Sequence, residues 1–160
     1  MQTEFEPRNP NYESVVRDSF SRQPYMADIG ARIDLIEPGI CELSLETRPG
    51  LTQQHGFFHG GLVAALADSA AGYACYSLYP PNSTVLTTEF KVSFLNPAQG
   101  GRLKAKGRVV KAGKTLFVCQ ADAYAEEAGK TSHCLTGLFT MMCLMGKSDA
   151  LNLGREAVST

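Results

Sequence analysis

The sequence has no long hydrophobic run. Its longest apolar stretches are residues 62–67 and 138–145, and Thr140 interrupts the second. A membrane-spanning helix needs about 20 apolar residues, so no membrane partner is expected. The first residues also lack the basic and apolar regions of a secretory signal. These two absences favour a cytoplasmic location.

The sequence also lacks a large excess of positive or negative charge, and its cysteines have no informative spacing. The 160 residues carry a formal net charge of −1, which argues against nucleic acid as a partner. The five cysteines are odd in number and scattered, without a Cys-x-x-Cys pair or the spacing of a zinc site. We expect buried thiols in a reducing compartment, no metal and no other cofactor. A catalytic cysteine stays an alternative.

Hydrophobic periodicity predicts one domain that contains two helices and six strands. The predicted helices cover residues 11–22 and about 59–78, and the strands cover residues 27–36, 40–47, 84–95, 102–110, 115–125 and 131–142. Tight turns between successive strands imply an antiparallel sheet, so the predicted class is α+β. A single long apolar helix suggests that the sheet wraps around it. Alternation along 84–95 places Thr88 with Phe90 on one face and Thr87 on the other.

Three segments are predicted along the chain. Residues 1–24 form an N-terminal helical segment, residues 25–145 form the main domain, and residues 146–160 are a polar tail that we expect to be frayed. The main domain therefore carries the long helix and all six strands.

Asp68 is the only formally charged residue between Arg48 and Glu89, histidines aside. It lies in an otherwise apolar run of small residues that begins at His59. Removing an unpaired carboxylate from water is costly, or it raises the pKa of the group. Such a carboxylate suits a catalytic base or nucleophile. An ion pair with a distant Lys or Arg stays the alternative.

The start of the long helix offers hydrogen-bond donors. The first backbone N–H groups, at His59, Gly60 and Gly61, have no intrahelical partner and lie at the positive end of the helix dipole. They could stabilise a developing oxyanion. Gly60 and Asp68 are separated by about 12 Å along the axis, so one helix cannot place both around one carbonyl. A second copy of the helix from a partner subunit could.

A motif at the helix start resembles the signature of hotdog-fold acyl-CoA thioesterases of the PaaI type. It reads Gln53-x-x-Gly56-x-x-His59-Gly60-Gly61, followed by Asp68. Residues 87–98 and 107–114 resemble the same family, and the likeness extends over about residues 25–143. The resemblance implies a curved antiparallel sheet around one central helix. It also implies a homodimer with active sites across the interface, and we expect that dimer to assemble into a homotetramer.

The resemblance implies hydrolysis of acyl-CoA to acid and CoA, with a role for each matched residue. Asp68 matches the catalytic base or nucleophile, and Gly60 matches the residue whose N–H polarises the thioester carbonyl of the opposite subunit's site. His59 matches a histidine that supports this region. Gln53 falls where many members have Asn, and Thr87 where some have a hydroxyl near the attacking water. Capping by His59, and ordinary polar roles for Gln53 and Thr87, stay open.

Basic residues cluster on one predicted strand and the turn that follows it. Residues 102–114 contain six positive charges and no acid. Coenzyme A is anionic, and we predict that Arg108, Lys111 and Lys114 contact its phosphates. A merely solvated basic face is the alternative.

Two other functions remain open at this point. The first is an acyl-CoA-binding module without catalysis. The second is an enoyl-CoA hydratase-like enzyme on the same fold, which would use a catalytic histidine at another position.

Overall fold

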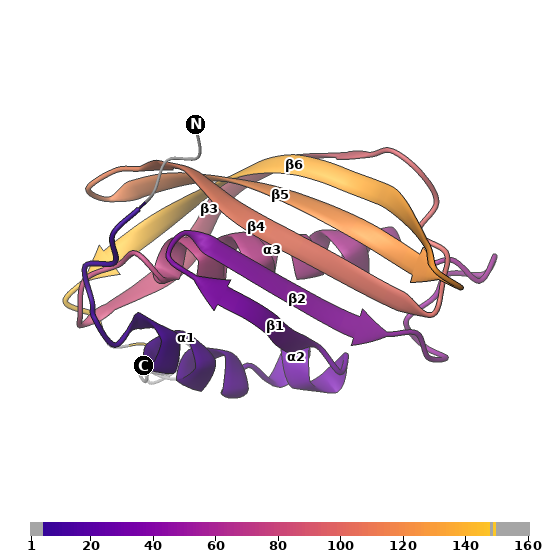
Figure 1. The fold of residues 1–160 in the computed structure, drawn as a ribbon, viewed down its shortest axis with the longest axis horizontal. Coiled ribbons are helices and arrows are strands. Elements are labelled where there is room, and N and C mark those ends of the chain that lie inside the picture. Colours follow the sequence, from indigo (N-terminus) through magenta and orange to yellow (C-terminus); the bar gives the residue numbers. More distant parts are fainter. Residues whose placement is uncertain (1–4, 148, 150–160) are drawn as a thin grey trace, which may run out of the picture.

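The structure, a computed structural model, describes residues 5–147 and residue 149. Its elements in chain order are α1 (Tyr12–Ser21), α2 (Pro24–Asp28), β1 (Arg32–Glu37), β2 (Ile40–Glu46), α3 (Gly60–Tyr76), β3 (Ser83–Phe94), β4 (Arg102–Ala112), β5 (Leu116–Glu127) and β6 (Lys130–Met145). All pairings in the six-stranded sheet are antiparallel, and the strand order is β1-β2-β4-β5-β6-β3. Figure 1 shows the sheet curving around α3, with α1 and α2 beside β1. The predicted α+β class is confirmed.

The central helix α3 begins with a side-chain cap. His59 has an extended backbone, and its Nδ1 accepts a hydrogen bond from the Gly61 N–H at 3.0 Å. This satisfies one of the donors that every helix start leaves unpaired. Pro80 and Pro81 follow the helix and cannot continue it. Of the helices described, none is both long and apolar enough to cross a membrane.

The core lies between α3 and the concave face of the sheet. A Cβ atom added to Gly107 of β4 would lie 2.4 Å from the carbonyl oxygen of Ala70, so the helix backbone rests directly on the strand. All five cysteines are free and buried. Burial raises the pKa of the Cys41 and Cys75 thiols, which keeps them protonated and favours packing over catalysis.

The prediction for the first strand was wrong at its beginning. The segment predicted as strand from residue 27 starts inside α2, and β1 begins only at Arg32. Pro24 at the first turn of α2 favours a helical start. Gly30, with φ of +72°, then reverses the chain before β1.

The predicted faces of β3 were also wrong for Thr87. A β-bulge separates Thr87, which pairs with Met141, from Glu89, which pairs with Thr140. The extra residue shifts the alternation, so Thr87 lies on the concave face together with Phe90. This irregularity turns the Thr87 hydroxyl toward α3.

The predicted N-terminal helical segment and the predicted main domain share one hydrophobic core. Val16 of α1 is fully buried and belongs to the same hydrophobic cluster as α3 and the sheet. In the predicted tail 146–160, residue 148 and residues 150–160 lie outside the described residues. Asp149 is described, and its carboxylate forms an ion pair with Arg22 at 2.8 Å and accepts a hydrogen bond from Thr84.

Candidate active site

Asp68 lies on the third turn of α3, where the helix passes beneath the bulge of β3. The Thr87 hydroxyl donates a hydrogen bond to Asp68 Oδ1 at 2.9 Å. No salt bridge in the described part of the chain involves Asp68. The ion-paired alternative therefore has no support among these residues, and the carboxylate keeps an oxygen free for chemistry.

The environment of Asp68 opposes its ionisation. Partial burial raises the pKa of the Asp68 carboxyl, and the hydrogen bond from Thr87 lowers it by a smaller amount. A carboxylate with a raised pKa is a stronger base than an aspartate in water, and at neutral pH it can still accept a proton. The arrangement suits general-base or nucleophilic chemistry.

A pocket of about 190 Å³ opens beside this carboxylate. Its lining combines one turn of α3, the first half of β3 and the loop between α1 and α2, through Gln23, Asp68, Ser69, Gly72, Tyr73, Val85, Leu86 and Thr87. The two sequence-predicted residues Asp68 and Thr87 thus share one pocket. The pocket also contains Gly72 and Tyr73, which the sequence marks as a small residue one turn beyond Asp68 and as an aromatic residue that could line an acyl pocket. The structure adds Gln23, for which the sequence has no signal.

Gly60 lines a different pocket, of about 410 Å³, at the start of α3. Gln53, Phe57 and Phe58 line the same pocket, together with the end of β3 and residues 95–98. Within the described chain, no hydrogen bond uses the Gly60 N–H. This donor is therefore available to a carbonyl oxygen in the pocket.

The loop that carries Gln53 is fixed by backbone hydrogen bonds. Phe58 N–H donates to the Ala98 carbonyl at 2.8 Å, and His59 N–H donates to the Leu51 carbonyl at 3.0 Å. The Gln53 side-chain oxygen accepts a hydrogen bond from the His55 N–H, so it is used within its own loop. His59 is exposed and acts as the helix cap. The capping role is the one that its contacts show.

The predicted site is therefore split into two halves. Asp68 with Thr87 occupies one pocket, and Gly60 with Gln53 occupies the other. The step of about 12 Å along α3 separates them. No single carbonyl can contact both halves in one chain.

The predicted phosphate contacts lie in neither half. Arg108 is exposed on the outer face of the sheet, where its guanidinium donates to the Gln120 side chain. Lys111 and Lys114 are exposed at the hairpin between β4 and β5. Other cations of β4 are neutralised: Lys104 pairs with Glu126, for example. Among the described residues, the cations of 102–114 that have no acidic partner lie toward the hairpin end: Arg108, Lys111 and Lys114.

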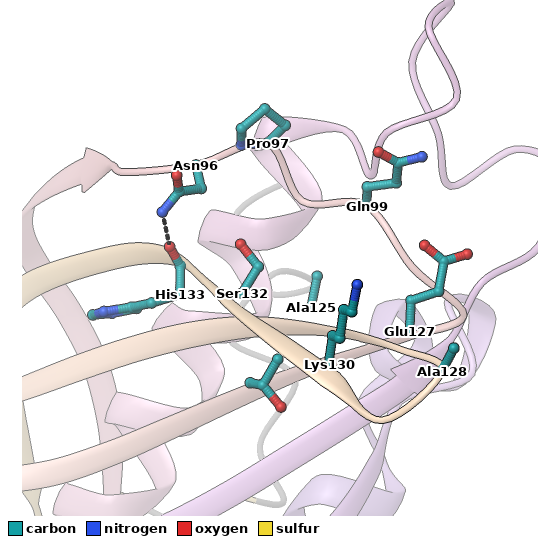
Figure 2. A pocket seen from close by; sticks show the side chains of 10 residues that line it. Asn96, Pro97, Gln99, Ala125, Glu127, Ala128, Lys130, Ser132 and His133 are labelled. Atoms are coloured by element: carbon teal, nitrogen blue, oxygen red, sulfur yellow. Dashed lines mark hydrogen bonds between the residues drawn. The ribbon is translucent and has the colours of Figure 1, made fainter.

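A third pocket, of about 790 Å³, adjoins the Gly60 pocket and shares Asn96 and Pro97 with it. Figure 2 shows its polar lining, in which Lys130 and Glu127 lie near the tip of the β5–β6 hairpin. The Asn96 side chain donates to the His133 carbonyl at 2.9 Å and holds the loop after β3 against β6. This pocket has one cation and one carboxylate and was not expected from the sequence. No group of three or more metal-ligating side chains was found in the described residues.

Comparison with known proteins assigns the chain to a family. The sequence profile of the thioesterase superfamily matches residues 55–132, which include Gly60, Asp68 and Thr87 but not Gln53. One relative is SSO1253 of Saccharolobus solfataricus, which is named provisionally as an esterase. The two sequences are 31% identical over 127 residues, which cover 79% of this chain and 82% of SSO1253. The chain belongs to the thioesterase superfamily. It is a thioester hydrolase with the hotdog fold.

Solved structures and a further relative agree with this assignment. A thioesterase family protein from Silicibacter pomeroyi is 51% identical with a TM-score of 0.83, and the match covers 84% of this chain and 99% of that one. The E. coli PaaI protein shares the fold, with a TM-score of 0.76 at 20% identity over 88% of this chain and 98% of that one. The medium/long-chain acyl-CoA thioesterase YigI of E. coli is 24% identical over 119 residues, 65% of this chain and 77% of YigI.

Proposed function

We propose that this thioesterase hydrolyses acyl-CoA thioesters with Asp68 as the catalytic base or nucleophile. One observation carries the proposal: a half-buried carboxylate without a cationic partner among the described residues contacts a hydroxyl inside a pocket. The name of the relative YigI supports coenzyme A as the carrier of the acyl group. Water and the thioester give a carboxylic acid and the thiol of CoA.

The proposed chemistry assigns one step to each half of the site. Asp68 accepts a proton from water while the water oxygen attacks the thioester carbonyl carbon, or the carboxylate attacks this carbon itself and water then hydrolyses the anhydride. The Gly60 N–H donates a hydrogen bond to the carbonyl oxygen as negative charge develops there. The carbon–sulfur bond breaks, and the leaving thiolate takes up a proton. Thr87 orients the carboxylate, and we assign Gln53 to the acyl carbonyl or the water.

A homodimer would join the two halves through β3. Leu86 and Thr87 near the start of β3 line the Asp68 pocket, and Phe94 at its end lines the Gly60 pocket. β3 is the last strand of the sheet, and such an edge offers unpaired N–H and C=O groups to a second chain. Antiparallel pairing of two β3 edges about a two-fold axis brings the start of one strand beside the end of the other. The Asp68 pocket of one subunit then meets the Gly60 pocket of its partner.

Exposed apolar side chains support this assembly and a larger one. On β3, Phe90 and Phe94 are about half exposed on the concave face, at 47% and 57%, and Leu86, 49% exposed, lies on the outer face. Exposed patches of this kind mark association surfaces. Leu116 and Leu138 are similarly exposed on the neighbouring strands β5 and β6, and we assign them to the contact between dimers in a homotetramer.

The basic hairpin is the proposed contact for the CoA phosphates. In the β3-paired dimer the hairpin between β4 and β5 lies at the same end of the sheet as the start of β3. It is therefore three to four strand spacings, roughly 14–19 Å, from the partner's Gly60 pocket. Lys111 and Lys114 then meet the phosphates across the interface, with Arg108 on the outer face of the same hairpin. A Lys111→Ala/Lys114→Ala double variant should raise KM for acyl-CoA in a salt-dependent way, whereas Lys130→Ala should not. The reverse result would move CoA into the pocket of Figure 2.

The proposed function is tested by an acyl-CoA hydrolysis panel run on the wild type and Asp68→Asn. We expect kcat to fall by about 10²–10⁴-fold in the variant, with an unchanged dimer. Asp28→Asn, a substitution at an exposed aspartate, is the matched control. Near-normal hydrolysis by Asp68→Asn would refute the role of this residue. Acyl-CoA binding without turnover by the wild type would favour a binding module, and water addition to an enoyl-CoA would favour a hydratase.

The five buried free thiols support a cytoplasmic location.

A further inference from the structure

Gly72 is an unusual residue for its place in α3. It lies in the buried second half of the helix, where glycine is less favourable than alanine. Its backbone is helical, so no positive φ requires a glycine. A Cβ atom added there would meet nothing within 4 Å, so close packing does not require a glycine either. Gly107 of β4 is the opposite case, because the α3 backbone at Ala70 fills the space that a Cβ atom would need.

The empty space above Gly72 belongs to the Asp68 pocket. Gly72 lies one helical turn beyond Asp68, and both line the same cavity of about 190 Å³. An acyl group whose carbonyl lies at Asp68 would extend along the helix over Gly72. The missing side chain is what leaves room for it.

Two hydrogen-bonded side chains border the pocket beyond Gly72. The Gln23 side-chain amide donates to the Tyr73 hydroxyl at 2.7 Å, and the Ser19 hydroxyl lies 3.3 Å from the same oxygen. Tyr73 is 3% exposed and also packs edge-on against Phe20 at 5.6 Å between ring centroids. Because α1 and the α1–α2 loop hold this group in place, it forms a fixed wall rather than a movable one.

We propose that Gly72, Gln23 and Tyr73 set the size of the acyl group, and that this thioesterase prefers compact acyl groups. A cavity of about 150 Å³ holds benzene, so the Asp68 pocket fits a single six-membered ring or a chain of roughly six to eight carbons. Longer chains meet the Gln23–Tyr73 wall. This proposal rests on the proposed function, because it takes Asp68 as the point where the carbonyl reacts.

The experiment compares kcat/KM for acetyl-, hexanoyl-, hexadecanoyl- and benzoyl-CoA in the wild type and Gly72→Ala. One methyl group in a substrate pocket changes discrimination by about 10–200-fold, so the hexanoyl-to-acetyl and benzoyl-to-acetyl ratios should fall at least about tenfold. Gly101→Ala, which also places a Cβ in open space but outside the pocket, should keep the wild-type ratios. The melting temperature of Gly72→Ala should stay the same or rise by roughly 2–4 °C, because alanine is the better helix former. Gln23→Ala should increase the relative rate with hexadecanoyl-CoA.

The outcomes separate this inference from the proposed function. Unchanged ratios in Gly72→Ala, or equal wild-type rates with hexanoyl- and hexadecanoyl-CoA, would overturn the inference and leave the role of Asp68 intact. If the wild type hydrolyses none of these substrates, the proposed function fails. Binding of non-hydrolysable S-alkyl-CoA analogues then decides the inference alone: about tenfold weaker binding of S-hexyl-CoA by Gly72→Ala supports it, and equal binding refutes it.

Discussion

The two halves of α3 differ in what surrounds them. From Ala70 to the end of the helix at Tyr76, and in the three residues that follow, every residue is buried. The tyrosines at 73, 76 and 79 form a chain of ring contacts that ends on Phe117. From Gly60 to Ser69 buried residues alternate with half-exposed ones, and this half carries the free Gly60 N–H and the Asp68 carboxylate. One continuous helix therefore supplies part of the core with one half and the proposed reactive groups with the other. Changes to the reactive groups of the first half should cost activity, and changes that disturb the packing of the second half against the sheet should cost stability.

The largest expected effect on activity, apart from loss of Asp68, comes from removing the Gly60 N–H. Gly60→Pro deletes this donor, and proline suits the first helical position because His59 already has an extended backbone, with φ of −61° and ψ of 132°. We expect kcat to fall by about 10²–10³-fold, the usual cost of losing one oxyanion donor. Circular dichroism should show an unchanged helix content.

Gly60→Ala is the matched control for this substitution. It adds the same Cβ, which would lie 3.3 Å from the Phe94 ring, but keeps the N–H. If Gly60→Ala lost as much activity as Gly60→Pro, crowding against Phe94 would explain both results and the donor would have no special role.

The contact between β4 and the second half of α3 should be sensitive in stability rather than in activity. Gly107→Ala would press a methyl group against the Ala70 carbonyl at 2.4 Å, and we expect a loss of about 1–3 kcal/mol in the free energy of unfolding. Chemical denaturation measures this loss directly. Gly101→Ala lies next to the same strand without a neighbour within 4 Å and should change the free energy little. Equal stability of both variants would contradict the close contact between α3 and β4.

Asp68→Asn should lower activity and yet raise stability at neutral pH. Burial raises the pKa of Asp68 in the folded protein above its ordinary value of 3.8, so the folded state holds its proton more tightly than the unfolded state does. Stability from this group is therefore fully present below the unfolded pKa and is lost as pH rises through the folded pKa. The amide of Asp68→Asn does not ionise, so the variant does not lose this stability as pH rises. Melting temperatures of the two proteins should diverge as pH rises above about 4, and parallel curves would contradict the assignment.

The smallest expected effect concerns the hydrogen bond that the bulge of β3 provides. Thr87→Val removes the hydroxyl that lowers the pKa of Asp68, so this pKa should rise further. The acid limb of the kcat/KM profile should then move to higher pH, while the plateau changes less. Thr88→Val, whose hydroxyl donates to the Thr140 carbonyl, is the control on the neighbouring residue. An acid limb that does not move would mean that Asp68 does not govern it.

Much of the fold follows from local sequence, because binary patterning and turn residues fix the strands and the long helix. The Ala-rich run closed by Pro80 and Pro81 predicts α3, and the turns at Gly113 and Gly129 predict consecutive antiparallel strands. The identity of Asp68 as a special residue also follows from sequence, because a lone carboxylate in an apolar run requires a reason.

The remainder depends on contacts that local sequence does not encode. The bulge of β3 arises from pairing with β6, so strict alternation placed Thr87 on the wrong face. The α1–α2 loop reaches Tyr73 from about fifty residues away, and no local pattern marks Gln23 as part of the pocket. The role of the β4 cations also changes once acids from other strands neutralise several of them.

The most direct test of the account is complementation between two inactive variants. Asp68→Ala lacks the carboxylate and Gly60→Pro lacks the donor, so each homodimer should be inactive. After mixing, unfolding and refolding in equal amounts, half of the dimers are mixed, and each mixed dimer has one site with both groups intact. If Asp68 and Gly60 of one site come from opposite subunits, the mixture should recover about one quarter of wild-type activity. Activity that never exceeds the sum of the two separate variants would contradict the shared site.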